Sequence, residues 1–351
     1  MAYYKCGKIF ATQNSNTSIE TASGAIANFN TQLAMPVLGC NAEFSASQAS
    51  GTPTPSAPIP IVGVDKVNIT RTGKNLVSDI LTGMTVASNG SIVSSGSSNS
   101  LAIAPVKSGY RYTITTDDAS NFVGGFFTDK PVQGSVTYNG SRIVGQAKTF
   151  TAPIDGWVAF RTSYEYATAQ LEFGETATTY EAPTVVNIII NLGGTYYGGS
   201  IDAVTGKITL THEIRVYDGT ENGWNKSSTY NGSFYINTGK RHLNRNAKCS
   251  HAEFVSSLGS YVYGKFALDG NGYVNLNAFV QGTGVDLPTF KTWLATEYAN
   301  GTPLTTTLEL ETPIVVYASN TAEIPTLNGD NQVYADTGDV EVKYRKLHSD
   351  N

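Results

Sequence analysis

The sequence predicts an all-β protein in which an antiparallel, jelly-roll-like β-sandwich is inserted into a second β domain with one short helix. Charged residues make up only 15% of the chain, while 35 glycines and 20 tyrosines are present. The charged fraction usual in globular proteins is roughly 25%, and this composition favours turns and strands over helices. Short alternating stretches recur between turn residues, as in a sandwich. The 351 residues exceed one ordinary core and indicate two or three domains.

The first thirty residues are polar and poorly patterned, and residues 14–18 have the composition of a loop. We therefore expect residues 1–30 to form no core and to anchor the protein to its neighbours. A frayed tail is the equally weighted alternative.

Residues 31–73 are expected to begin the outer β domain. A short strand is predicted at residues 40–44, followed by a proline-rich extended connector at 51–60. Residues 61–71 then alternate between apolar and polar side chains, with one break.

Residues 74–183 show the clearest strand pattern and are expected to form the inserted sandwich. Tyr110 to Thr115 alternate with period two, as a half-buried strand does. Further strands are predicted at residues 122–127, 157–160 and 169–173, with turns between them.

Residues 184–351 are expected to complete the outer domain. Strands are predicted at residues 185–192, 207–212, 304–310, 314–318 and 340–345. One helix is predicted from Leu287 to Tyr298, because Asp286 can cap it, Pro288 suits its first turn and Asn300-Gly301 can end it.

Several stretches resemble structural proteins of phages and prophages of Gram-positive bacteria. The matching residues are 51–76 (GTPTPSAPIPIVGVDKVNITRTGKNL), 197–209 (YGGSIDAVTGKIT) and 327–345 (LNGDNQVYADTGDVEVKYR). The part between Asn75 and Pro183 is similar to carbohydrate-binding-like jelly-roll modules of phage tail and baseplate proteins, on residues 110–114, 150–153 and 170–174. The resemblance implies a virion structural protein but not its position on the particle. Residues 1–20 match no part of these proteins.

Charge and motifs exclude several function classes. The net charge of −5 and the absence of a basic run argue against nucleic-acid binding. No apolar run is long enough to cross a membrane, and no signal peptide begins the chain. Cys6, Cys40 and Cys249 are too few and too widely spaced for a disulfide framework or zinc site. The four histidines lack a metal-binding spacing, so we expect neither metal nor cofactor.

Acidic pairs raise the possibility of glycan hydrolysis. The candidates are Asp117-Asp118, Glu172 with Glu175, and Asp336 with Asp339. Hydrolysis needs two carboxylates facing each other across a sugar, and neighbouring strand residues face opposite sides. We expect no enzymatic activity.

A glycan-binding site is the alternative. On the strand at residues 157–161, Val158 and Phe160 are expected to face the core, which places Trp157 and Arg161 together on the other face. Exposed aromatic rings stack on sugars while polar groups bind the hydroxyls. Tyr164, Tyr166 and Asp117 are expected to join the site. The competing interpretation is that Trp157 only covers a sheet edge.

The function expected from these observations is a non-enzymatic virion protein of a tail fibre, baseplate or head fibre. It would be made in the host cytoplasm, stand on the virion surface and bind bacterial surface glycans weakly. Its N-terminal segment would contact other virion proteins, and a homo-oligomer, a trimer or dimer, is the default expectation for such an appendage. A purely architectural or decoration protein and a glycan depolymerase are the alternatives.

Overall fold

The computed structural model describes residues 17–31, 37–96, 99–116, 122–146, 148–163, 168–228, 233–243, 245–255, 264–268, 273–277, 285–324 and 329–347. Within these residues the fold is built of antiparallel sheets and a single helix, which confirms the predicted all-β class. The pairing of β23 (Glu253–Phe254) with β24 (Lys265–Leu268) is the one parallel exception among the described strands. No helix in the described part of the chain is both long and apolar enough to span a membrane.

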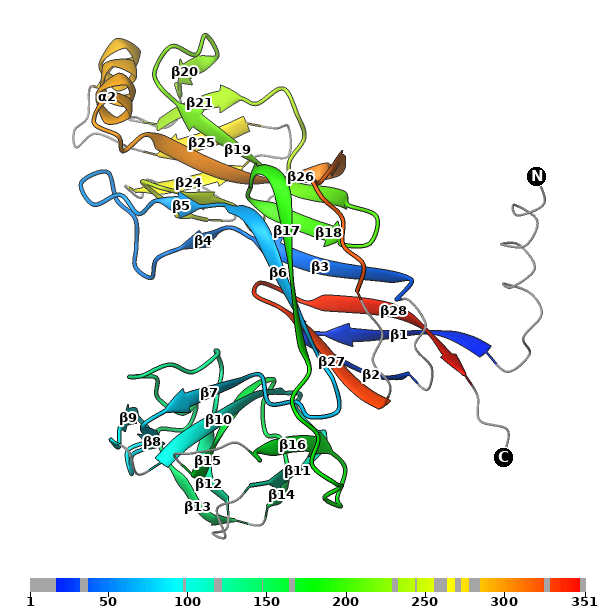
Figure 1. Cartoon of the computed structure of the whole chain (residues 1–351). Coiled ribbons are helices and arrows are strands. Elements are labelled where there is room, and N and C mark those ends of the chain that lie inside the picture. Colours follow the sequence, from blue (N-terminus) through cyan, green and yellow to red (C-terminus); the bar gives the residue numbers. More distant parts are fainter. Residues whose placement is uncertain are drawn as a thin grey trace, which may run out of the picture.

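The central unit is an outer sandwich of two sheets (Figure 1). The larger sheet has the order β1-β28-β3-β18-β19-β26-β22 and the smaller has the order β17-β6-β27-β2. The larger sheet contains β1 (Thr17–Gly24), β28 (Val340–Leu347), β3 (Gly39–Ser45), β18 (Gly198–Asp202), β19 (Lys207–Tyr217), β26 (Leu304–Tyr317) and β22 (Lys248–Cys249). The smaller contains β17 (Val185–Tyr196), β6 (Val64–Thr72), β27 (Gly329–Ala335) and β2 (Ile26–Thr31).

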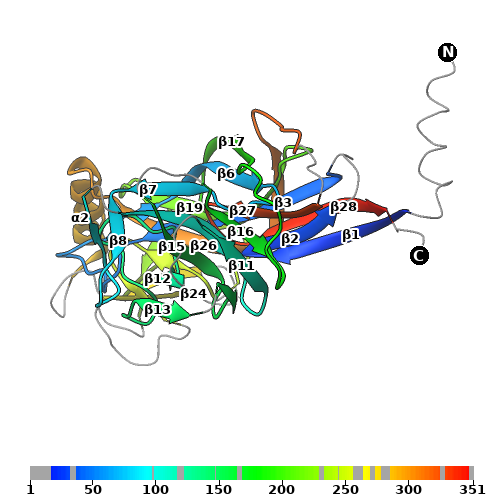
Figure 2. The ribbon, with the colours of Figure 1, turned by 60° about the horizontal axis from the view of Figure 1, so that its bottom comes forward.

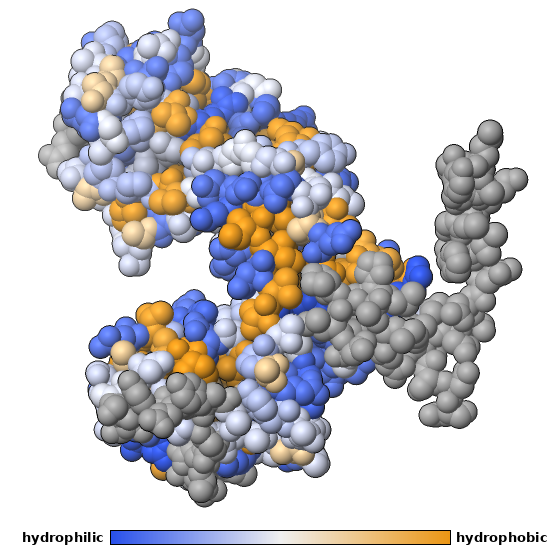
Figure 3. All heavy atoms as spheres, in the orientation of Figure 1, coloured by the Kyte–Doolittle hydropathy of each residue, from blue (hydrophilic) through white to orange (hydrophobic). Residues whose placement is uncertain are grey.

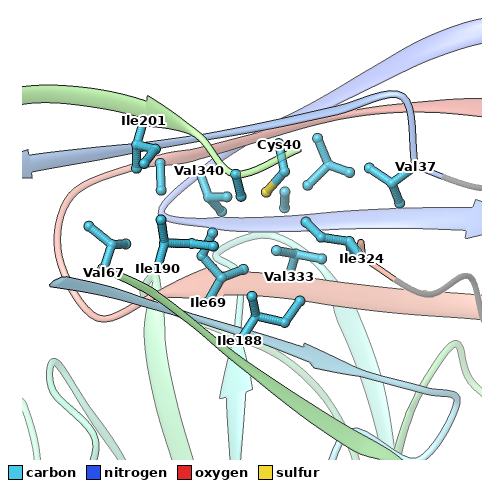
Figure 4. Close-up of a cluster of buried hydrophobic side chains, with 14 of the residues drawn as sticks. Val37, Cys40, Val67, Ile69, Ile188, Ile190, Ile201, Ile324, Val333 and Val340 are labelled. Atoms are coloured by element: carbon cyan, nitrogen blue, oxygen red, sulfur yellow. The ribbon is translucent and has the colours of Figure 1, made fainter. Parts of the chain in front are cut away.

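Alternating apolar side chains from both sheets fill the core of this sandwich. Ile188 and Ile190 of β17 point inward, as do Cys40 and Ala42 of β3, and Figure 4 shows the two sheets meeting through such side chains. Burial raises the pKa of the Cys40 thiol to about 12, an effect to which nearby Asp202 adds. This cysteine therefore behaves as a small buried apolar side chain.

The first two strands overturn one sequence prediction. Residues 1–30 were expected to form no core, yet β1 pairs with β28 along its whole length, and Ile26, Ala27 and Phe29 of β2 are buried. The apolar positions of β2 alternate too briefly to stand out beside the polar residues before them. Figures 1 and 2 both show β1 and β28 side by side, extending away from the rest.

The insert, residues 73–184, leaves the outer sandwich after β6 and returns at β17. Val185 and Thr72 are paired across these two strands, so the chain departs and returns at neighbouring positions. Such closely spaced ends are what an insertion into a host domain requires.

The insert is itself an antiparallel sandwich. One sheet has the order β13-β12-β15-β10-β7, the other has β14-β11-β16, and the hairpin β8-β9 packs beside them. Its strands are β7 (Asp79–Thr82), β8 (Met84–Val86), β9 (Ile92–Ser94), β10 (Asn99–Val106), β11 (Arg111–Thr115), β12 (Phe122–Phe127), β13 (Ile143–Gln146), β14 (Thr149–Thr151), β15 (Gly156–Ser163) and β16 (Gln170–Phe173).

A third body, the α2 lobe, lies between β19 and β26 and was not anticipated. Tyr217 and Leu304 pair where the chain leaves and re-enters the large sheet, so the arrangement repeats that of the insert. The lobe contains α2 (Leu287–Ala299) and a sheet with the order β20-β21-β25-β24-β23; its remaining strands are β20 (Trp224–Lys226), β21 (Ser233–Asn237) and β25 (Tyr273–Asn277).

The helix agrees with its prediction. The side chain of Asp286 accepts a hydrogen bond from the backbone N–H of Thr289 at 2.9 Å, Pro288 lies in the first turn, and Asn300 is the C-cap. Phe290 packs inward and stacks on Phe234, with ring centroids 4.1 Å apart.

The proline-rich connector closes against this lobe. The short strands β4 (Ser47–Gln48) and β5 (Ile61–Val62) pair at its base. Gln48 Nε2 donates to the carbonyls of Ile59 and Cys249, and the N–H of Ile59 donates to the carbonyl of Ser250. The connector is therefore held to the α2 lobe by backbone carbonyls rather than left free.

Candidate functional site

A groove of about 700 Å³ lies where the insert meets the small sheet of the outer sandwich. Figure 3 shows the molecule hollowed between the α2 lobe and the insert, with hydrophobic side chains along the part that joins them. The outer face of the small sheet forms the floor of the groove, and the edge of the insert forms its wall. Neither the insert nor the outer sandwich alone contains the site.

The floor is polar along β6 because this strand presents only alternate side chains to the core, whereas Val185 and Ile189 of β17 add apolar surface to it. Val67 and Ile69 are fully buried in the outer sandwich, so Asn68 and Thr70 face the groove. The Thr70 hydroxyl donates to Oδ1 of Asn187, its exposed cross-strand neighbour on β17, at 2.9 Å. A row of hydroxyl and amide groups therefore crosses the sheet.

Tyr334 brings an aromatic ring to the same floor. It pairs with Thr70 across β27 and β6. Burial raises the pKa of the Tyr334 phenol, although hydrogen bonds with Ser78 and Thr70 oppose the shift. The phenol therefore stays protonated at neutral pH, where it can both donate and accept hydrogen bonds.

The wall is built around Trp157 at the beginning of β15. Its ring is half-buried and meets the ring of Tyr334 edge-on, with centroids 5.1 Å apart and planes at 84°. The ammonium group of Lys130 lies 5.8 Å from the Trp157 ring centroid and 3.0 Å from Asp79 Oδ2. Two aromatic rings and an ion-paired lysine therefore lie at one end of the groove.

Carboxylates and amides complete the lining. Asp336 accepts two hydrogen bonds from Asn68, one from the backbone N–H at 3.2 Å and one from Nδ2 at 2.8 Å. Asp129 and Asp155 line the groove from the insert side, and Asp155 Oδ1 also accepts from the backbone N–H of Ser108. The arrangement can bind hydroxyl groups by hydrogen bonds and offer aromatic surface to an apolar ring face.

The insert is held in place by polar contacts beside the groove. The Tyr112 hydroxyl accepts hydrogen bonds from the backbone N–H of Lys107 at 2.9 Å and from Gln332 Nε2 at 3.3 Å. Lys107 Nζ donates to the carbonyl of Ser23 at 2.7 Å. These bonds join β11 and the end of β10 to the outer sandwich, and they fix the spacing of wall and floor.

The sequence-predicted site residues are not brought together as expected. Val158 and Phe160 do face the core, but the opposite face of β15 is not open. Ala159 on that face is fully buried beneath the β8-β9 hairpin, in a second small core between Trp157 and Arg161. The expectation of a shared exposed face was therefore wrong.

Trp157 lies in the groove, whereas Arg161 is half-buried four residues further along β15, opposite Leu101. Asp117, Tyr164 and Tyr166 lie outside the described residues.

Two of the carboxylate pairs considered for hydrolysis separate in the fold, and the third, Asp117-Asp118, lies outside the described residues. Glu172 is buried and accepts hydrogen bonds from Gln170 Nε2 and from both the N–H and hydroxyl of Thr178, which is a structural role. Glu175 forms an exposed ion pair with Arg111. Asp336 lines the groove. Asp339 instead lines a separate depression over the large sheet.

Sequence reasoning missed most of the floor. The strand containing Asn68 was predicted, and the polar side of its alternation was the available signal for Asn68 and Thr70. The strand containing Tyr334 was not predicted, and nothing local connects it with Trp157.

A second cluster of ionisable groups lies at the junction of the outer sandwich and the α2 lobe. Glu213 of β19 accepts from His242 Nε2 at 3.0 Å, from Lys240 Nζ at 2.7 Å and from Arg215 Nε at 2.7 Å. Burial alone would raise the pKa of the Glu213 carboxyl, but these three partners lower it to about 2. The cluster joins β19 to residues 240–242 of the α2 lobe. Among the described residues no three His, Cys, Asp or Glu side chains are arranged to hold a metal ion.

Comparison with known proteins yields no assignment for this site, because no family model, curated protein or solved structure matches the chain.

Proposed function

We propose that this protein is a non-enzymatic structural component of a bacteriophage virion, a tail-fibre, baseplate or head-fibre subunit, that attaches to bacterial surface glycans through the groove. The observation that carries the proposal is the placement of Trp157 and Tyr334 beside the polar side chains of the floor. The resemblance of the sequence to phage structural proteins supplies the biological setting.

The groove has the two kinds of surface that sugar binding requires. A pyranose ring has apolar faces that pack on aromatic rings, and hydroxyls at its edge that need fixed polar partners. Trp157 and Tyr334 offer the first, and Asn68, Asn187 and Asp336 offer the second. Most of these polar groups are on sheet strands, which hold them more rigidly than loops would.

Attachment would depend on many copies. A shallow polar groove gives weak binding at one site, and repeated copies on a particle raise the effective concentration. A closed oligomer, a trimer or dimer, would present the copies in register. Because β1 and β2 belong to the outer sandwich, the segment left to contact other virion proteins lies before Thr17.

Binding to cells tests the proposal. The fluorescently labelled protein, displayed multivalently on beads, would be titrated onto a panel of Gram-positive bacteria. Trp157→Ala and Asn187→Ala alter the wall and the exposed floor separately, and Tyr298→Ala removes an exposed aromatic ring on α2 as a matched control. Thermal unfolding of each variant shows whether the fold is retained.

We expect saturable binding that both groove variants weaken and the control leaves unchanged. Binding that no groove variant alters would move the site elsewhere on the protein. A complete lack of binding under multivalent display would favour the purely architectural alternative.

A further inference from the structure

Carboxylates are prominent among the polar groups of the groove, although Trp157 and Asn187 also bring N–H donors to it. Asn68 uses its Nδ2 group to donate to Asp336, which fixes the orientation of the amide. Its Oδ1 atom is thereby left buried without a hydrogen-bond partner. This atom has almost no accessible surface, so a ligand that donates hydrogen bonds would bind the exposed carboxylate of Asp336 beside it instead.

The charges of the groove point the same way. Asp129, Asp155 and Asp336 line it, against two lysines. Lys130 forms an ion pair with Asp79, so Lys66 is the lysine of the lining that remains to attract an anionic ligand. No arginine is among the described residues that line the groove, although arginine is the side chain best suited to bind carboxylate or phosphate in two places.

We infer that the groove binds a hydroxyl-rich glycan without acidic groups and discriminates against anionic polymers such as uronate chains and polyol phosphates. The inference rests on the proposed glycan-binding function and names the class of glycan. Sugar hydroxyls donate to the exposed carboxylates of Asp336 and Asp129.

An acidic sugar makes fewer of these contacts. A carboxylate or phosphate oxygen has no proton to donate at neutral pH, so it cannot donate a hydrogen bond to Asp336 or Asp129. It also approaches the exposed carboxylates of Asp129, Asp155 and Asp336, which repel it most strongly at low ionic strength. Specificity then comes from unfavourable contacts with the wrong ligand as well as favourable contacts with the right one.

The test uses the full-length protein and two classes of probe of matched length. Chitotetraose and maltotetraose are the uncharged probes, and tetragalacturonate and a glycerol-phosphate tetramer are the anionic probes. Affinities would be measured by ligand-observed NMR at low and physiological ionic strength. Asp336→Asn removes one charge from the floor while keeping an acceptor for Asn68, and Glu311→Gln removes an exposed charge on β26 as the control.

We expect an uncharged probe to bind and the anionic probes to bind more weakly, most clearly at low ionic strength. Asp336→Asn should reduce the ratio of the affinities for uncharged and anionic probes by roughly fivefold, the effect of one nearby like charge. Glu311→Gln should leave this ratio unchanged. Anionic probes that bind as tightly as uncharged ones, in a manner sensitive to Trp157→Ala, would overturn the inference but keep the groove as a glycan site. If Asp336→Asn leaves the difference unchanged, the charge argument is wrong. Lack of binding by every probe and every cell type would overturn the proposed function itself.

Discussion

Replacing Glu213 by glutamine is expected to make the protein less stable at neutral pH and less sensitive to acid. Glu213 is 14% exposed and accepts hydrogen bonds from His242, Lys240 and Arg215. In the unfolded chain these partners are absent, so the carboxyl returns to its ordinary pKa. The folded state therefore holds Glu213 ionised over a range of pH in which the unfolded state protonates it.

The pKa values set the size and the pH window of the effect. The pKa of Glu213 falls from 4.5 to about 2 in the folded protein. Each pKa unit corresponds to about 1.4 kcal/mol, so the ionised group contributes about 3 kcal/mol to the free energy of unfolding at pH 7. This contribution is complete above pH 4.5 and is lost as the pH falls towards 2. At pH about 3 roughly 2 kcal/mol of it should be gone.

Urea unfolding at pH 7 and at pH about 3, followed by tryptophan fluorescence, measures the difference. We expect the free energy of unfolding of the original protein to fall by about 2 kcal/mol more than that of Glu213→Gln between the two conditions. Burial would raise the pKa of Glu309, but Arg245 and Asn246 lower it, and this contribution is common to both proteins. Glu311→Gln should follow the original protein. If Glu213→Gln loses as much stability in acid as the original protein does, the role assigned to this cluster is wrong.

Three further substitutions test the packing of the insert, the packing of the α2 lobe and the attachment of the insert to the outer sandwich. Gly124→Ala should destabilise the insert by about 1–3 kcal/mol, because a Cβ at this position would overlap the carbonyl oxygen of Ala159. A Cβ at Gly39 has room, so Gly39→Ala should be near neutral in urea unfolding. Equal effects of the two substitutions would contradict this reasoning. Phe290→Ala should cost about 3–5 kcal/mol in the same measurement, since the ring is fully buried in the α2 lobe, and a loss below 1 kcal/mol would mean that the lobe repacks. Tyr112→Phe removes the acceptor of one buried and one partly buried donor and should cost about 1–3 kcal/mol. Limited proteolysis should then cut between the insert and the outer sandwich sooner, and an unchanged cleavage pattern would show that these bonds do not hold the insert.

Local patterns in the sequence identified elements whose cause is local. The helix α2 carries its cap at Asp286 beside its apolar stripe. The alternation of Tyr110 to Thr115 located the strand β11, but this strand is not half-buried as predicted, because Thr113 is buried beside Tyr112 and Ile114. The strand β2 escaped because only Ile26, Ala27 and Phe29 record its burial among polar neighbours.

The groove could not be derived in the same way. Alternation correctly divided the faces of β15, but it could not reveal that the β8-β9 hairpin covers the face shared by Trp157 and Arg161. The meeting of Trp157 with Tyr334 joins residues far apart in the chain. It depends on how the insert sits on the outer sandwich, which in turn depends on contacts such as that between Tyr112 and Gln332.

The pairing of β1 with β28 has a mechanical consequence. Thr17 pairs with Leu347 and Gly24 with Val340, so the start of one strand and the end of the other lie together at the same end of the ribbon. If a particle holds the protein at this end while a bacterium pulls on the insert, tension runs along both strands. Because both strands are pulled from the same end, the hydrogen bonds between them bear little load. The hydrogen bonds from β28 to its other neighbour, β3, are instead loaded together in shear, rather than opening one after another as in a zipper. The protein would then withstand a steady pull best along the axis on which attachment applies it.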